Sequence, residues 1–331
     1  MRNLTMLTDL YQLTMMYGYY KTGMRNNIAT FDMFYRSKDE TTHYAIMAGL
    51  EQLIEYIENL HFDEAAISYL RSLNIFDEDF LEELSRFKFH GDIYAVPEGT
   101  IVFSNEPLIR VTAPVFEAQL IETALLNIIN HQTLIATKAS RVVQAAENDT
   151  VMEFGLRRAQ GPDAGIYGAR AAIIGGCKST SNVLTGQMYN IPIAGTHAHS
   201  WVMSFPDEVT AFRKYAEMFP TSCLLLVDTY DTLKSGVPNA ITVFNELRAQ
   251  GHEPVGIRLD SGDLAYLSRE ARKMLDAAGF PNTKICASGD LDEKLIRDLK
   301  LQGACIDTWG VGTKLNIISI LRCCARHSSI L

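Results

Sequence analysis

The sequence has 331 residues, enough to bury a large core and to form two domains or one large barrel with an added layer. Apolar residues make up 47% and charged residues 21%, which is typical of a globular protein. The formal net charge of -9 argues against a general nucleic-acid-binding or anionic-membrane surface. The negative net charge is still compatible with a local cluster of arginines around an anionic substrate.

The start of the chain is too polar for a signal peptide, and no apolar run is long enough to span a bilayer. The cysteines show no metal-binding spacing, and four of the six lie in apolar or strand-like context, which favours buried reduced thiols. They are Cys177, Cys223, Cys286, Cys305, Cys323 and Cys324. We therefore expect a cytoplasmic enzyme without a membrane or nucleic-acid partner.

The first third of the chain predicts α+β structure with an antiparallel sheet. A helix is expected from about Thr8, which we predict to cap it, and alternation over residues 30–36 predicts a strand. Apolar residues at helical spacing predict an amphipathic helix over residues 45–60. Two short helices follow, with Asp63 and Asp77 as caps. Pro and Gly turns then separate three short strands, at 91–99, 101–103 and 108–112.

After Pro114 the pattern changes. A long helix is expected over 116–148, broken once near His131. Strands then alternate with helices, as in a parallel α/β barrel or a doubly wound sheet. The expected strands are 151–154, 191–195, 224–227, 255–259, 284–287 and 306–311, and the helices between them begin near 163, 207, 238, 264 and 291. The predicted domains are residues 1–115 (α+β), 116–315 (α/β barrel) and 316–331 (a divergent tail).

The loops that follow parallel strands gather at one end of such folds, where substrates bind. Arg157 and Arg158 follow the first strand, and an arginine there can grip phosphate or carboxylate, although a surface charge explains one of them. Arg258 and Asp260 share one face of a strand, which suits a ligand with phosphate and diol groups. A structural ion pair is the alternative. Asp228 opens a further tip, Asp228-Thr-Tyr-Asp231, with two carboxylates.

Two glycine-containing tips, Ser288-Gly-Asp290 and Gly310-Val-Gly-Thr313, resemble phosphate cradles, because glycine lets backbone N–H groups approach an anion. Two such tips on consecutive strands make phosphate the leading ligand class. The small polar run 175–182 is either pocket lining or a plain loop. His199, in the stretch 193–202, is equally a structural histidine or a catalytic, phosphate-accepting one. The residues alone indicate a phosphate-handling α/β enzyme.

Seven blocks of sequence together carry a resemblance to a known family. They are Leu7-Thr-Asp-Leu-Tyr-Gln-Leu-Thr-Met15, Phe31-Asp-Met-Phe-Tyr-Arg36, Glu153-Phe-Gly-Leu-Arg157, Thr180-Ser-Asn-Val183, Gly195-Thr-His-Ala-His-Ser200, Arg258-Leu-Asp-Ser-Gly-Asp263 and Gly310-Val-Gly-Thr313. In this order and with these separations, from about residue 4 to 315, the chain resembles the nicotinate phosphoribosyltransferases.

The resemblance implies an irregular type II phosphoribosyltransferase α/β barrel beside an N-terminal α+β layer, and a homodimer with sites near the subunit interface. The implied reaction joins nicotinate and phosphoribosyl pyrophosphate into nicotinate mononucleotide and pyrophosphate, in NAD salvage. It would need Mg²⁺ and would be coupled to ATP hydrolysis.

The family's functional residues carry over by motif. His199 matches the histidine that ATP transiently phosphorylates. Tyr11 and Phe154 match aromatics that sandwich the pyridine ring, with the tyrosine supplied by the partner subunit. Thr196 matches a nicotinate contact, and Arg36 an arginine that reaches a phosphate across the dimer. On spacing alone, Tyr11 is better explained as a core aromatic and Arg36 as a surface charge.

The remaining matches concern the phosphoribosyl group. Arg157 and Arg258 match contacts to phosphoribosyl pyrophosphate and to the carboxylate, and Asp260 matches a ribose hydroxyl contact. His199, Asp260 and Arg258 are thus the expected catalytic set, and Asp228 is added as a substrate-binding carboxylate. The resemblance assigns the 5′-phosphate to Gly289, Asp290, Gly310, Gly312 and Thr313.

Ser181 bears on the choice of base. The related nicotinamide phosphoribosyltransferases carry an aspartate at the matching position, and aspartate accepts from an amide NH₂ but repels a carboxylate. Ser181 therefore favours nicotinate over nicotinamide, and nicotinamide is the alternative substrate.

The resemblance stops after Leu315, and residues 316–331 match nothing expected. A truncation or a shifted reading frame is the simplest interpretation, since the family continues into a further C-terminal region. A third hypothesis follows, in which the chain is an inactive fragment that binds only phosphate or a partner subunit.

Overall fold

The computed structural model of the protein describes residues 2–36, 43–316 and 322–330, with side chains described as far as Leu315. The chain divides into two compact units. The N-terminal unit comprises Met1–Thr137 and Ser319–Leu331, and the parallel unit comprises Lys138–Ile318. The division falls inside helix α5 (Val115–Ala146). The domain boundary predicted at residues 115/116 remains a prediction.

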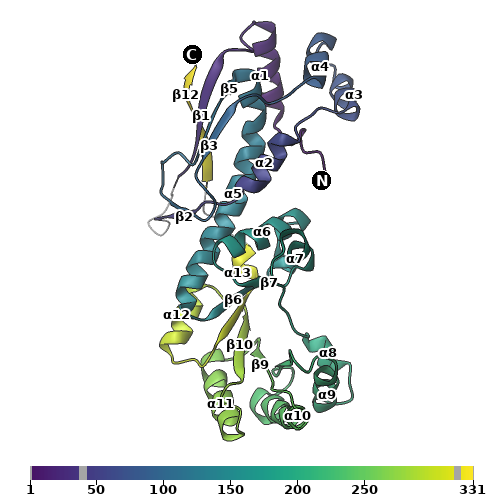
Figure 1. Ribbon diagram of the computed structural model, residues 1–331, viewed down its shortest axis with the longest axis vertical. Coiled ribbons are helices and arrows are strands. Elements are labelled where there is room, and N and C mark those ends of the chain that lie inside the picture. The colour runs from purple at the N-terminus through teal and green to yellow at the C-terminus, as the bar shows by residue number, and fades with distance from the viewer. Residues whose placement is uncertain (1, 37–42, 317–321, 331) are drawn as a thin grey trace. The chain divides into compact units, whose positions relative to one another are not determined.

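The N-terminal unit holds a four-stranded sheet in the order β12-β1-β5-β3, and its pairs are antiparallel. The strands are β1 (Ile28–Arg36), β3 (Asp92–Ala95), β5 (Ile109–Pro114) and β12 (Arg322–Ile330). Two further strands, β2 (Ala45–Ile46) and β4 (Ile101–Val102), form a separate antiparallel pair. The antiparallel α+β character expected for this region is confirmed (Figure 1).

The helices of this unit are α1 (Leu10–Lys21), α2 (Leu50–Glu58), α3 (Glu64–Ser72) and α4 (Glu78–Ser85). They share one apolar core with β1, β5 and the first turns of α5. Aromatic rings crowd that core, and Phe80, which is fully buried, contacts the rings of Tyr17, Phe76 and Phe116. Burying rings of this size is a large share of what drives the unit to fold.

Of the three helix N-caps predicted in this unit, two are confirmed and one is wrong. The capping predictions for Asp63 and Asp77 are confirmed, since their carboxylates accept from the N–H groups of Ala66 and Phe80. The prediction for Thr8 is wrong. Asp9 occupies the N-cap position of α1, and the Thr8 hydroxyl donates to the carbonyl of Leu120 instead.

Two other expectations in this region are corrected. The helix expected over 45–60 begins only at Leu50, because Ala45–Ile46 pair with β4. The break expected near His131 does not occur, since α5 runs without interruption for 32 residues. Apolar side chains such as Ile128, Ile129 and Ile135 are buried on either side of it, so packing continues through that position.

The parallel unit contains a six-stranded parallel sheet in the order β7-β6-β11-β10-β9-β8. The strands are β6 (Thr150–Glu153), β7 (Ser179–Thr180), β8 (Leu224–Leu226), β9 (Gly256–Leu259), β10 (Lys284–Gly289) and β11 (Thr308–Val311). The helices and turns between them are η1 (Leu156–Arg158), α6 (Pro162–Ile174), α7 (Val183–Tyr189), α8 (His199–Met203), α9 (Glu208–Met218), η2 (Thr232–Gly236), α10 (Val237–Ala249), α11 (Leu264–Ala277), α12 (Glu293–Leu301) and α13 (Thr313–Asn316). The predicted parallel α/β architecture is confirmed (Figure 1).

One predicted strand is missing, and its place explains how the sheet is completed. Residues 191–195 form only an isolated bridge, between Ile193 and Thr180. The backbone there exchanges hydrogen bonds with edge strand β7, from Thr180 N to Pro192 O (3.1 Å) and from Ala194 N to Thr180 O (2.9 Å). At the other edge, Leu226 N of β8 donates to His197 Nε2 (3.2 Å). Residues 192–197, named here the closing segment, thus link the two edges of the sheet without joining its ladder.

No helix in the described part of the chain is long and apolar enough to cross a membrane.

Candidate active site

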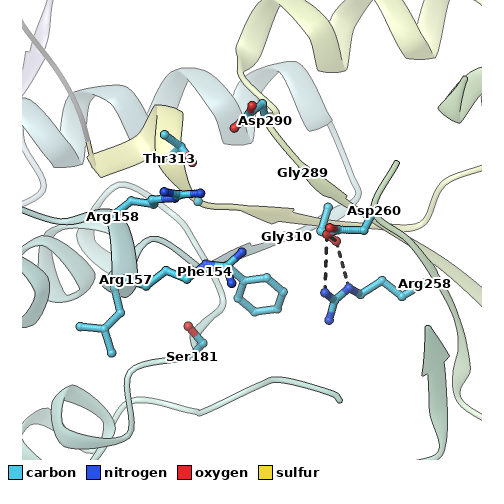
Figure 2. Close-up of a pocket in the computed structure, with 13 residues that line it drawn as sticks. Phe154, Arg157, Arg158, Ser181, Arg258, Asp260, Gly289, Asp290, Gly310 and Thr313 are labelled. Carbon is cyan, nitrogen blue, oxygen red and sulfur yellow. Dashed lines mark hydrogen bonds and ion pairs between the residues drawn. The ribbon is translucent and has the colours of Figure 1, made fainter. Parts of the chain in front are cut away.

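The loops that follow the parallel strands enclose a cavity of about 530 Å³, at the carboxyl ends of β6, β7, β9, β10 and β11. Its lining residues are Phe154, Leu156, Arg157, Arg158, Ser181, Arg258, Asp260, Ser288, Gly289, Asp290, Gly310, Gly312 and Thr313. Figure 2 shows Phe154 between the Arg157–Arg158 side and the facing Arg258 and Asp260. Ten of the residues predicted from sequence as site residues therefore meet in one cavity, together with three that were not in that set.

The Phe154 ring lies against a glycine of the neighbouring strand. A Cβ atom at Gly310 would come within 2.6 Å of two ring carbons of Phe154, and a Cβ at Gly312 would lie 3.0 Å from the Phe154 carbonyl oxygen. The Phe154 N–H donates to Val311 O (2.8 Å), which fixes the backbone beneath the ring. These two glycines are thus needed for packing an aromatic wall, a reason separate from the predicted approach to phosphate.

Arg157 and Arg158 bring positive charge to the cavity. Both lie on the short 3₁₀ turn η1, both are exposed, and neither guanidinium has a hydrogen bond or ion pair within the described residues. Structural arginines normally pair with carboxylates. Two cations at a cavity wall without a protein partner indicate an anionic ligand, and the fork geometry of arginine matches carboxylate and phosphate.

Arg258 and Asp260 form the opposite wall and are held by hydroxyl groups. Arg258 Nε donates to Ser288 Oγ (2.9 Å) and Nη1 to Thr196 Oγ1 (2.7 Å). Asp260 Oδ1 lies 3.5 Å from Arg258 Nη2 and accepts from Ser288 Oγ. Thr196 does not line the cavity itself, but it fixes the guanidinium that does. The ion pair between Arg258 and Asp260 that was the alternative interpretation of the sequence therefore exists. Its 3.5 Å separation leaves both groups able to contact a ligand.

Asp228 is a buried carboxylate behind this wall, with its side chain 2% exposed. Its Oδ2 accepts from Asp260 N (2.9 Å) and Ser261 Oγ (2.6 Å), so it positions the turn after β9. Its Oδ1 has no hydrogen-bond partner among the described residues. A buried carboxylate oxygen without a donor is costly, which indicates that a cation or a proton donor completes the site.

His199 faces these carboxylates from the first turn of α8. Its Nε2 lies 4.0 Å from Asp228 Oδ1 and 3.8 Å from Asp260 Oδ2, and its Nδ1 lies 3.2 Å from Thr229 Oγ1. The imidazole side chain is 40% exposed. His199 is therefore accessible, oriented by a hydroxyl, and close to two carboxylates. This arrangement suits a proton-transfer or nucleophilic role.

His197 has a different environment. Its ring is buried, packs edge-on against Tyr215, and accepts the Leu226 N–H at Nε2. Burial is the main cause that lowers the pKa of His197 to about 4, and the nearby Arg258 guanidinium adds to it. It is therefore a neutral structural group, while His199 is the histidine that faces the site.

The loop after β10 differs from the helix-based phosphate cradle expected there. Helix α12 begins at Glu293 rather than near Leu291, and the Asp292 carboxylate accepts from the N–H groups of Lys294 and Leu295. The helix therefore satisfies its own first-turn donors. Gly289, with φ +119°, shapes the loop itself, and the exposed Asp290 follows it. An anion here would meet loop backbone rather than a free helix terminus.

The second carboxylate considered with Asp228 has a structural role. Asp231 caps the turn η2, where its Oδ1 accepts from Leu233 N (3.2 Å) and Lys234 N (2.9 Å). In the next loop, Asp263 likewise accepts from Tyr266 N and caps α11. Of the acidic residues that follow β8 and β9, only Asp228 and Asp260 face His199 in the described structure.

Cysteine chemistry plays no part in this cavity. Cys177, Cys223 and Cys286 are buried free thiols, and burial raises the pKa of each to about 12. The expectation of buried reduced thiols is confirmed for these three, and Cys305 is partly exposed. Cys323 and Cys324 have side chains outside the described residues. Over the described ranges, no group of three or more His, Cys, Asp or Glu side chains could hold a metal ion.

Two family models cover most of the chain. The N-terminal domain of nicotinate phosphoribosyltransferase matches residues 6–130, and the nicotinate phosphoribosyltransferase family matches residues 150–316. The chain belongs to the nicotinate phosphoribosyltransferase family.

Individual relatives agree with this assignment. The nicotinate phosphoribosyltransferase of Bacillus subtilis is 54% identical over 313 residues, which is 95% of this chain and 64% of the relative. The human nicotinate phosphoribosyltransferase is 33% identical over an alignment that covers 94% of this chain and 68% of the human protein. The chain thus spans a little under two thirds of the length of its Bacillus relative.

Solved structures show the same fold. The crystal structure of human nicotinic acid phosphoribosyltransferase superposes with a TM-score of 0.88 at 31% identity, covering 98% of this chain and 74% of the human one. A nicotinate-nucleotide pyrophosphorylase from Pyrococcus furiosus superposes with a TM-score of 0.79 at 24% identity and covers 98% of this chain and 75% of that one, a likeness of fold alone.

Two residues that the resemblance assigns to the family's site belong to the N-terminal unit rather than to the unit that contains this cavity. Tyr11 lies on α1 and Arg36 ends β1, both in the N-terminal unit. Tyr11 is 52% exposed, so the interpretation of it as a core aromatic is wrong. The Arg36 guanidinium lies over the Phe34 ring, 5.4 Å from its centroid, and is exposed. Their roles in substrate binding remain predictions.

Sequence reasoning left several site residues out of its predicted set. Ser288 holds both Arg258 and Asp260, Thr229 contacts His199, and Leu156 and Arg158 line the cavity. Glu153 is fully buried just behind the cavity wall. Each of these lies one or two residues from a residue that was predicted. The sequence signal that could have found them is the whole loop after each strand, rather than single motif positions within it.

Proposed function

We propose that this chain carries the activity of its family, the transfer of a phosphoribosyl group from phosphoribosyl pyrophosphate to nicotinate, in NAD biosynthesis. The observation that supports it best is the cavity itself. One wall offers an aromatic face and two arginines without protein partners, and the facing wall offers the Arg258–Asp260 pair. This combination fits a flat anionic base on one side and a charged sugar phosphate on the other.

The proposed reaction requires positioning more than proton transfer. The pyridine nitrogen of nicotinate forms a bond to C1′ of the ribose, while the bond from C1′ to the pyrophosphate oxygen breaks and its electron pair leaves with pyrophosphate. The nitrogen lone pair is already available, so no base has to deprotonate it. Phe154 would stack on the ring, Arg157 with Arg158 would meet the carboxylate, and alignment would supply much of the rate.

Charge develops at both ends of the breaking bond. Arg258 is placed to stabilise the leaving pyrophosphate, and Asp260 to face a ribose hydroxyl or the positive charge that develops on the ribose. The sugar's 5′-phosphate would lie in the two glycine-containing loops, where the cavity is lined by Gly289, Asp290, Gly310, Gly312 and Thr313.

We further propose that ATP phosphorylates His199. An imidazole nitrogen of His199 would form a bond to the γ-phosphorus as the bond from that phosphorus to ADP breaks, and later hydrolysis would release phosphate. The exposure of the ring and its contact with Thr229 support this role, together with the match of the motif around it. The neighbouring Asp228 and Asp260 would stabilise the imidazole while it carries positive charge.

Mg²⁺ is the metal that the family implies. Mg²⁺ is usually bound by one or two carboxylates together with substrate phosphates and water rather than by a cage of protein ligands. The exposed carboxylate of Asp290 and the Oδ2 of Asp260 fit that donor set at this cavity. When bound, the ion would neutralise charge on the phosphates and on the leaving pyrophosphate.

We propose a homodimer as the working form, because the family resemblance assigns Tyr11 and Arg36 to a partner's substrate and both side chains are exposed. In that assembly they would act on a partner's substrate. The cytoplasmic location expected from the sequence stays a prediction.

The activity is tested by incubating the chain with nicotinate, phosphoribosyl pyrophosphate and Mg²⁺, with and without ATP, and measuring nicotinate mononucleotide and pyrophosphate. We expect product in both cases and more of it with ATP. The Bacillus subtilis relative, which is longer, serves as the positive control. Absence of product from this chain under conditions where the relative is active would contradict the proposed activity and leave the family membership intact.

Base preference is tested separately at Ser181, which lines the cavity. The Ser181→Asp variant should lose activity with nicotinate and gain it with nicotinamide, because the new carboxylate repels one base and accepts from the other. A variant with unchanged preference would show that Ser181 does not face the base.

A further inference from the structure

Glu153 is a buried carboxylate that contacts two of the loops lining the cavity. It is the last residue of β6, the strand between β7 and β11, and its side chain is fully buried. Because side chains alternate along a strand, Glu153 points away from the direction taken by the next residue, Phe154. Glu153 does not itself line the cavity, and the proposed reaction gives it no role.

One carboxylate oxygen fixes the turn that follows β6. Glu153 Oε1 accepts the backbone N–H of Gly155, directly after Phe154. The residues that follow, Leu156–Arg158, form η1 and carry the two arginines of the cavity wall. This contact orders the turn that carries them.

The other oxygen fixes the tip of β7. Glu153 Oε2 accepts from the hydroxyl of Thr180 at 2.5 Å. The same hydroxyl accepts from Asn182 N (3.0 Å), and the Asn182 side chain donates to Gly165 O (3.1 Å) and accepts from Thr185 N (3.2 Å). Thr180 and Asn182 are both buried.

Ser181 lies between these two fixed residues. Its own N–H donates to Glu153 O (2.9 Å), so Glu153 also holds the Ser181 backbone directly. Its side chain lines the cavity on the same wall as Phe154 and Arg157. Through its backbone and its side chain, Glu153 therefore sets the relative positions of Phe154, the arginine turn and Ser181.

We propose that Glu153 is a positioning residue for base selection, which fixes Phe154 and Ser181 at the spacing of a pyridine carboxylate through Gly155 and Thr180. This inference rests on the proposed function. It differs from a purely structural role in one measurable respect: loosening the network should affect the base and spare the phosphoribosyl donor, whose contacts come from β9, β10 and β11.

The sharpest variant is Thr180→Val, which keeps the shape of the side chain and removes the hydroxyl that bridges Glu153 and Asn182. We expect the KM for nicotinate to rise about tenfold and the preference for nicotinate over nicotinamide to fall, with the KM for phosphoribosyl pyrophosphate unchanged. Glu153→Gln should act in the same direction. Thr180→Ser, which keeps the hydroxyl, should restore the values of the unaltered chain.

Ser268→Ala is the matched control. Ser268 is a buried residue of α11 whose hydroxyl donates to Ala265 O (3.2 Å) and accepts from Cys305 N (3.1 Å), away from the cavity lining. It should lower thermal stability without changing either KM. If Thr180→Val lowers turnover with both bases equally and leaves both KM values and the preference intact, as a general loss of folded protein would, the positioning role is wrong.

The two proposals can fail separately. If the unaltered chain makes no product with either base, the proposed function fails. The positioning role is then read from calorimetric binding of nicotinate. Weaker binding by Thr180→Val with recovery by Thr180→Ser would support it, and equal binding by the unaltered chain and Thr180→Val would overturn it.

Discussion

The two units differ in what they bury. In the N-terminal unit the buried polar side chains of the described residues are neutral threonines and glutamines, such as Gln12 and Gln119, which bond to each other between α1 and α5. In the parallel unit the described residues include buried side chains of acidic and basic types: Glu153, Arg170, His197, Glu208 and Asp228. Buried charges cost far more to desolvate than buried amides and are kept where they are paired or used.

This difference indicates that the polar groups of the two units have different roles. Aromatic packing stabilises the N-terminal unit, and its polar groups complete hydrogen bonds. In the parallel unit, buried carboxylates and a buried histidine fix the loops at the ends of β6, β8 and β9. Changes in the first unit should therefore act mainly on stability, and changes at the strand ends of the second mainly on activity.

The largest effect is expected at Phe80, which is fully buried among four other rings of the N-terminal unit. Phe80→Ala should lower the free energy of unfolding by about 3–5 kcal/mol, since it removes buried area and leaves a cavity. Urea unfolding measures this. Activity per folded molecule should stay unchanged, and a selective loss of activity would contradict this difference in roles.

Arg258 tests the opposite case. Arg258→Gln should lower kcat/KM for nicotinate mononucleotide formation by about 10²–10³-fold, because a positioned charge is lost where the leaving group would develop charge. Its melting temperature should change little, as its pair with Asp260 is loose, at 3.5 Å. Arg213→Gln, which removes an exposed ion pair with Glu246, is the control and should change neither quantity much.

Acid should weaken the parallel unit through His197. Burial lowers the pKa of His197 from 6.5 to about 4, so the folded state holds the neutral form over a range where the unfolded chain takes up a proton. Its contribution to stability is therefore complete above about pH 6.5 and is lost as the pH falls toward 4. In His197→Gln, the unfolding free energy should fall less between pH 6.5 and pH 4 than it does in the unaltered chain. Parallel curves for the two proteins would show that His197 is not held neutral.

The smallest expected effect concerns a helix cap. Asp63→Ala removes the acceptor for Ala66 N at the start of α3 and should cost about 1 kcal/mol in unfolding free energy. Asp63→Asn should retain most of the stability, because an amide oxygen can also cap. Both are measured by chemical denaturation, and equal losses in the two variants would rule out capping as the cause.

Local signals in the sequence predicted local features. Asp63 and Asp77 were identified as caps because a cap is set by residues within one turn of it. The strand at Ala45–Ile46 was missed because its partner, β4, lies more than fifty residues later. The closing segment was mistaken for a strand for a related reason: its apolar residues suit a strand, but its edge contacts come from a single bridge and a histidine ring.

The site was predictable to the extent that strand ends in a parallel sheet must converge. That rule predicts Arg258, Asp260 and the two glycine-containing loops in one place. It gave no role to Ser288 or Glu153, although both stand in the quoted motifs, since their roles follow from neighbours on other strands. It also predicted a free helix terminus after β10, which the side chain of Asp292 occupies.

The pairing of β12 with β1 bears on self-association. Backbone partners run from Ala29 with Ile330 to Arg36 with Arg322, so the outer edge of β1 is covered along its length. An uncovered strand edge offers a row of unpaired N–H and C=O groups to any other chain that can add a strand. Residues 322–330 thus shield β1 from the contact through which sheet proteins most readily aggregate. The cover on this edge of β1 is therefore supplied by a segment whose sequence lies beyond the matched family region.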